Sequence, residues 1–183
     1  MFLMTVQNEK VVKEIMKSKY KPCFWESKFA FQSERFLSAY NLIIEELHKK
    51  LKKQKGKTKY DSCMWGWVNK PFIDFHLKHL GKKSNKKLYA IFCNIPEKKM
   101  VFSDFDKYSD YLDGKTVDSF MVENFESGDT RCLQCSFEYL LPENISTIID
   151  VEDLKGLEKD SLDEMWMKTK RKNLVRKFST VNI

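Results

Sequence analysis

The sequence predicts an α+β fold with a small mixed or antiparallel sheet and flanking helices. Helical patterns dominate the first part of the chain, several short apolar runs with strand periodicity follow, and a charged helical pattern comes last. A hydrophobic content of 42% supports a real core in 183 residues. We therefore expect one domain over residues 1–150. Residues 151–183 are expected to form a helical extension, packed on the domain or mobile.

The beginning of the chain predicts a strand and then helices. Residues 2–7 alternate between two faces, and Thr5 and Gln7 share one of them. Asn8 is a typical N-cap for the helix that follows. An apolar stripe with helical spacing predicts a longer helix over residues 33–53.

A tryptophan-rich strand comes next, over residues 62–68. Trp65 and Trp67 fall on one face of it, and Gly66 leaves the other face open to close approach. Paired tryptophans are typical of core packing, and they can also form a stacking wall for a planar ligand.

Two further strands are predicted over residues 88–96 and 99–106. The tight turn at Pro96 between them favours a hairpin. A short helix over residues 106–112 follows, with Ser103 or Asp104 as its expected cap. As an alternative, an acidic residue at a strand end can hold a ribose hydroxyl or activate a nucleophile.

A last strand over residues 131–140 carries an unusual polar face. Gln134, Ser136 and Glu138 alternate with apolar residues and share one side. This pattern is compatible with the wall of a ligand cleft and with a solvent-facing surface.

Composition and motifs exclude several classes. No phosphate-binding glycine loop and no G-x-S-x-G motif is present. Cys132 and Cys135 have zinc-ligand spacing but would point to opposite faces of a strand, so we predict no metal site. The odd, scattered cysteines indicate reduced thiols, and no apolar run is long enough for a membrane span; we expect a cytoplasmic protein.

The formal net charge of +7 comes almost wholly from lysine. Lysine is a solvated point charge, whereas arginine suits bidentate recognition of phosphate and bases. The lysine-rich segments 49–59 and 168–177 are therefore either solvated faces or weak contact points for a nucleic-acid or protein partner.

The order of several short motifs resembles the bacterial family called "domain of unknown function 3841". The resemblance covers roughly residues 2–150, and the family name implies no activity. The motifs that carry it are T-V-Q at 5–7, F-L-S-A-Y at 36–40, W-G-W at 65–67, V-F-S-D-F-D at 101–106 and L-Q-C-S-F-E-Y-L at 133–140.

The same order of elements is similar, more loosely, to the ADP-ribosyltransferase fold, which implies a cleft for NAD or a nucleotide. By this analogy the late strand would supply the catalytic residues Gln134 and Glu138. The expected carboxylate position holds Ser136 instead, so a catalytically weak or inactive relative is implied. The residues that would hold the cofactor are Thr5, Gln7, Trp65, Trp67, Ser103 and Asp104.

Two hypotheses follow. The first is a transferase-like protein that binds NAD between the early and late strands. The second is a non-enzymatic interaction protein, related to a mobile element or to phage defence, that binds a macromolecule through a basic, aromatic surface. A pocket that gathers Gln7, Trp67, Asp104 and Gln134 would favour the first hypothesis, and an exposed tryptophan face beside the lysines would favour the second.

Overall fold

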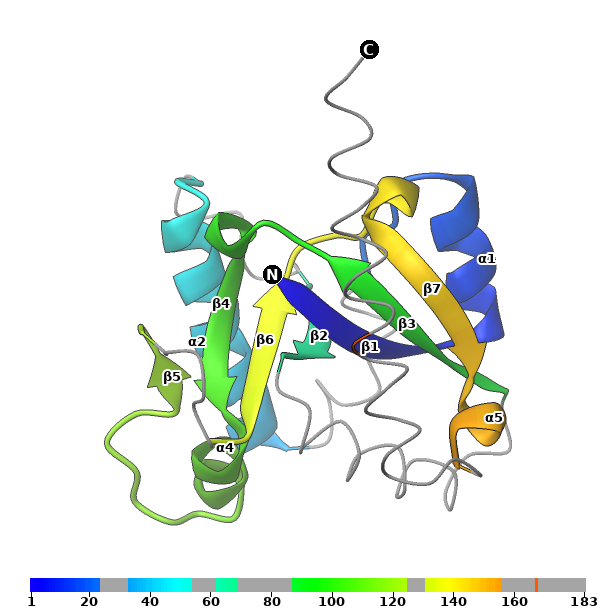
Figure 1. The fold of residues 1–183 in the computed structure, drawn as a ribbon. Helices are drawn as coiled ribbons and strands as arrows, with labels where there is room; N and C mark the ends of the chain where they lie inside the picture. Colours follow the sequence, from blue (N-terminus) through cyan, green and yellow to red (C-terminus); the bar gives the residue numbers. More distant parts are fainter. Residues whose placement is uncertain (24–32, 54–61, 69–86, 125–130, 156–166, 168–183) are drawn as a thin grey trace.

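Seven antiparallel strands form one twisted sheet, with helices packed against it (Figure 1). The structure is a computed structural model that describes residues 1–23, 33–53, 62–68, 87–124, 131–155 and 167. This architecture confirms the α+β class. The strands are β1 Phe2–Asn8, β2 Met64–Trp67, β3 Leu88–Asn94, β4 Met100–Asp104, β5 Met121–Val122, β6 Leu133–Phe137 and β7 Ile145–Asp150.

The helices begin where the sequence provides caps. Asn8 accepts a hydrogen bond from the backbone N–H of Val11 at the start of α1, and Ser33 accepts one from Phe36 at the start of α2. The α-helices are α1 Glu9–Lys17, α2 Glu34–Lys50, α4 Phe105–Leu112 and α5 Val151–Lys155. Two short 3-10 turns, η3 Glu97–Lys99 and η4 Pro142–Asn144, precede β4 and β7. No helix in the described part of the chain is long and apolar enough to cross a membrane.

The strand order in the sheet is β5-β4-β6-β2-β1-β3-β7. The predicted hairpin of residues 88–96 with residues 99–106 is therefore wrong. Strand β3 pairs with β1 and β7, while β4 pairs with β5 and β6, so both edges of each strand are already taken. Pro96 and the η3 turn connect β3 to the distant strand β4, and they do not form the two-residue turn of a hairpin.

Different helices pack against the two faces of the sheet. Helix α1 packs its Ile15 on the face that we call the α1 face, and α2 and α4 cover much of the other, the α2 face (Figure 1). Strand alternation assigns neighbouring residues to opposite faces. The α1 face includes Leu3, Ile91, Phe102 and Cys135, and the α2 face includes Met4, Trp65, Trp67 and Val101.

Gly66 confirms the close approach that was predicted at its position. A Cβ at this residue would lie 2.7 Å from Leu3 Cδ1 and 3.1 Å from the carbonyl oxygen of Met4. Glycine is therefore required here by the packing of β2 against β1, with no need for a ligand.

Candidate functional site

The polar face of β6 is buried. Gln134 is 6% exposed and Ser136 is 1% exposed. Both lie on the α2 face, opposite Trp67 and Trp65 in the register of β2. The interpretation of Gln134 as part of a solvent-facing strand surface is therefore wrong, because α2 and α4 cover this part of the sheet.

Other polar groups meet Ser136 beneath α2. The hydroxyl of Tyr40 lies 2.7 Å from Ser62 Oγ and accepts a hydrogen bond of 3.0 Å from the backbone N–H of Cys63. Burial raises the pKa of the Cys63 thiol to about 12, although the hydroxyl groups of Tyr40 and Ser136 act in the opposite direction. The thiol is protonated at neutral pH, and the cluster forms part of the core.

The two predicted tryptophans pack within the protein. The ring of Trp65 lies 6.0 Å from that of Tyr40 and 5.7 Å from that of Tyr108, measured between centroids. Trp67 meets Phe105 edge to face at 5.2 Å. These contacts are typical of aromatic core packing.

The predicted first-strand pair lies on the opposite side of the sheet. Thr5 and Gln7 alternate with Met4, which pairs with Trp67, so they share the α1 face with Leu3. Gln7 Nε2 donates to Thr5 Oγ1 at 2.9 Å. The sheet therefore separates Thr5 and Gln7 from Gln134 and Trp67, and does not gather them in one cleft.

Ser103 and Asp104 take separate roles at the end of β4. Asp104 Oδ1 accepts hydrogen bonds from the backbone N–H groups of Asp106 at 3.0 Å and Lys107 at 3.3 Å, so it caps α4 as predicted. Ser103 Oγ lies on the α2 face and donates to Gln134 Oε1 at 3.5 Å. This hydrogen bond joins two of the predicted site residues on the neighbouring strands β4 and β6.

Glu138 has a different environment from Gln134 and Ser136. It follows the end of β6, and its Oε1 lies 3.1 Å from Lys21 Nζ and 2.5 Å from Lys53 Nζ. Lys21 follows α1, and Lys53 follows α2. One carboxylate oxygen thus joins two lysines that are far apart in the sequence.

The next residue, Tyr139, brings in two more lysines. Lys19 Nζ lies 3.8 Å from the centroid of the Tyr139 ring, and Lys99 Nζ donates to the Tyr139 hydroxyl at 3.2 Å. Two backbone hydrogen bonds of 2.9 Å between Tyr20 and Leu140 hold the segments together. We call Lys19, Lys21, Lys53 and Lys99 the lysine cluster.

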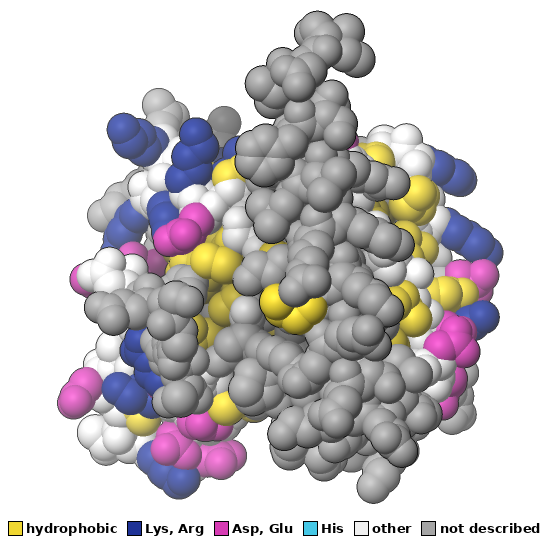
Figure 2. Space-filling model, viewed as in Figure 1, with side chains coloured by type: hydrophobic (Ala, Val, Ile, Leu, Met, Phe, Trp, Pro, Cys, Tyr) yellow, Lys and Arg dark blue, Asp and Glu magenta, His cyan; other side chains and the backbone are white. Residues whose placement is uncertain are grey.

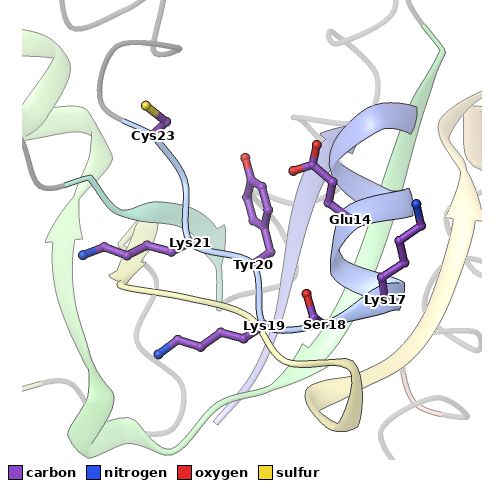
Figure 3. A pocket seen from close by; sticks show the side chains of 7 residues that line it. All are labelled: Glu14, Lys17, Ser18, Lys19, Tyr20, Lys21 and Cys23. Atoms are coloured by element: carbon purple, nitrogen blue, oxygen red, sulfur yellow. The ribbon is translucent and has the colours of Figure 1, made fainter.

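A pocket of about 340 Å³ borders the lysine cluster (Figure 3). It is lined by Glu14, Lys17, Ser18, Lys19, Tyr20, Lys21 and Cys23. Figure 3 shows Lys19 and Lys21 extending from the same side of their segment, while Tyr20 points another way. The pocket therefore shares two lysines with the cluster and adds a third cation, Lys17.

The cluster leaves an excess of positive charge at the surface. Two lysines pair with the carboxylate of Glu138, two more contact the neighbouring Tyr139, and further lysines lie in the last turn of α2. Figure 2 shows dark blue side chains gathered over that end of α2. An excess of positive charge of this kind attracts anions such as phosphate groups.

Sequence reasoning missed most of the cluster. Lysine was noticed in residues 49–59, of which Lys53 belongs to the cluster, but Lys19, Lys21 and Lys99 were not singled out. The alternation of lysines in K-S-K-Y-K, residues 17–21, was the available signal, because alternate residues of an extended segment share a side. Residues 54–59 of the first lysine segment and all of residues 168–177 lie outside the described residues.

No family model, curated protein or solved structure matches this chain. The resemblance to the family "domain of unknown function 3841" stays a prediction.

Proposed function

We propose that this protein binds nucleic acid through the lysine cluster, as a non-enzymatic interaction protein. The observation that carries the proposal is the convergence of Lys19, Lys21, Lys53 and Lys99, from three segments of the chain, on the adjacent residues Glu138 and Tyr139. A surface with a local excess of about three positive charges attracts a phosphate backbone and releases its counterions.

The residue types favour recognition of the backbone over recognition of bases. The cluster consists of lysines, which contact phosphate as point charges, and it includes neither of the described arginines. Arg131 donates to the carbonyl of Asn124, and Arg35 lies beside Gly114. The Tyr139 ring is already in contact with Lys19, so its face offers little room for a stacked base. We therefore expect binding that depends weakly on sequence.

The hypothesis of an NAD cleft of the ADP-ribosyltransferase type has less support. It needs Thr5 and Gln7 on the same side of the sheet as Gln134, and the strand register puts them on opposite faces. It also needs Glu138 available for the ribose, and this carboxylate is held by Lys21 and Lys53. We place the binding surface at the lysine cluster for these reasons.

Two charge-matched double variants test the proposal. Lys21→Gln with Lys53→Gln removes two lysines from the cluster. Lys13→Gln with Lys115→Gln removes two exposed lysines that pair with Glu9 and Asp110 elsewhere. We expect the cluster variant to bind a 20-base-pair DNA duplex at least about tenfold more weakly than wild type, and the control to change less than about threefold.

Fluorescence anisotropy with labelled duplexes of two unrelated sequences measures these affinities. Equal losses of duplex affinity in the two double variants would show that overall charge, and not the lysine cluster, determines binding. If wild type bound polyglutamate of matched charge as tightly as it binds the duplex, the partner would be an acidic protein and not a nucleic acid.

A further inference from the structure

The position of Glu138 suggests a role in selecting the ligand of the lysine cluster. The same oxygen, Oε1, contacts both Lys21 Nζ and Lys53 Nζ, at 3.1 Å and 2.5 Å. A phosphate oxygen bound by two lysines would make the same pair of charge-assisted contacts. The carboxylate therefore already occupies the space that an incoming phosphate would take.

Burial and charge hold this carboxylate in place. The Glu138 side chain is 14% exposed, whereas those of Lys21 and Lys53 are 39% and 35% exposed. The acid is thus more buried than the side chains of the two lysines that pair with it. Burial acts to raise the pKa of Glu138, but hydrogen bonds and charges from Lys53 and Lys21 outweigh it, and the pKa is lowered. The group is ionised at neutral pH.

We propose that Glu138 is an internal competitor that makes the lysine cluster selective for polyanions over small phosphates. This inference rests on the proposed function and names the residue that sets its specificity. A small anion must displace a tethered carboxylate from Lys21 and Lys53 to gain the same contacts. A nucleic-acid backbone also reaches Lys19 and Lys99, which Glu138 does not pair with in the described structure, and so gains contacts that offset the exchange.

The test compares Glu138→Gln with Glu14→Gln. Both variants remove one negative charge from the same surface, since Glu14 lines the adjoining pocket. Glu138 makes an ion pair with Lys21 and another with Lys53. Calorimetric titration with inorganic pyrophosphate and anisotropy with the 20-base-pair duplex give the two affinities. Thermal melting checks that each variant is folded.

We expect Glu138→Gln to bind pyrophosphate about tenfold more tightly than wild type, and to bind the duplex no more than about threefold more tightly. Glu14→Gln should change both affinities less than about threefold. The ratio of pyrophosphate affinity to duplex affinity should therefore rise in Glu138→Gln. A carboxylate that only held the lysines in place would not produce this rise when it is removed.

Two results would overturn the inference. Weaker binding of both ligands by Glu138→Gln would mean that the carboxylate only positions the lysines, and equal effects of the two variants would mean that charge alone matters. Either result leaves duplex binding by the wild type intact. Failure of the proposed function would appear separately, as a wild-type protein that does not bind the duplex.

Discussion

Alternate polar residues of one chain segment lie in two different environments. Gln134 and Ser136 are buried on the α2 face, where their neighbours are Ser103, Cys63 and the tryptophans of β2. Glu138 lies just past the strand end and pairs with two lysines from other segments. The alternation of residue types assigned a side of the strand to each residue. The elements that cover that side decide whether it becomes core or binding surface.

The buried region should lose stability in alkaline solution, which is the largest effect that we expect. Burial raises the pKa of Cys63 from 9.0 to about 12. Above pH 9 the unfolded thiol loses its proton while the folded thiol keeps it, so the unfolding free energy falls as the pH rises toward 12. Because one proton is involved, we expect the contribution of Cys63 to this fall to reach at most about 1.4 kcal/mol per pH unit, at a pH well above 9.

Urea unfolding at pH 8, 9 and 10 measures this dependence. Cys63→Ala should show a shallower fall with pH than wild type, whatever its stability at pH 8. Parallel curves for the two proteins would contradict the assignment of Cys63 as a buried, protonated thiol.

Two buried tyrosines allow a comparison between a hydroxyl that has hydrogen-bond partners and one that has none among the described residues. Tyr40→Phe removes a hydroxyl that contacts Ser62 Oγ and the backbone N–H of Cys63, and should cost about 1–3 kcal/mol. The buried hydroxyl of Tyr108 has no hydrogen-bond partner among the described residues. Tyr108→Phe should therefore change the unfolding free energy by less than about 1 kcal/mol or stabilise the protein. Equal costs in urea unfolding would show that the two hydroxyls have equivalent environments.

The lysine cluster should contribute little to stability, in contrast to the buried region. Lys21→Gln and Lys53→Gln, made singly, each leave Glu138 with its other lysine. We expect each to lower the unfolding free energy by less than about 0.5 kcal/mol, because partly exposed ion pairs contribute little. A loss above about 2 kcal/mol in either variant would make the cluster a structural element and weaken its assignment as a binding surface.

Local features of the fold were predictable from the sequence, and the pairing of distant segments was not. Asn8 and Asp104 cap helices as expected, because capping depends on residues within one turn. The pairing of β4 with β6 was missed, since it depends on which strand edges remain free after the rest of the sheet has formed.

The candidate site was predicted less well for the same reason. Strand alternation correctly put Gln134 and Ser136 on one face, but their burial depends on α2, which lies about ninety residues earlier in the chain. Glu138 was singled out for catalysis, and its two lysine partners could not be identified from spacing. Lys21 and Lys53 meet because the segments that follow α1 and α2 both reach Glu138, just past the end of β6.

The salt dependence of duplex binding tests the central claim most directly. For wild type, the logarithm of the association constant should fall with the logarithm of salt concentration with a slope of about −3 to −4, as expected for up to four phosphate contacts on duplex DNA. For Lys21→Gln with Lys53→Gln the slope should be shallower by about 2, whereas Lys13→Gln with Lys115→Gln should keep the wild-type slope. A slope near zero for wild type, or the same slope in all three proteins, would contradict nucleic-acid binding by the lysine cluster.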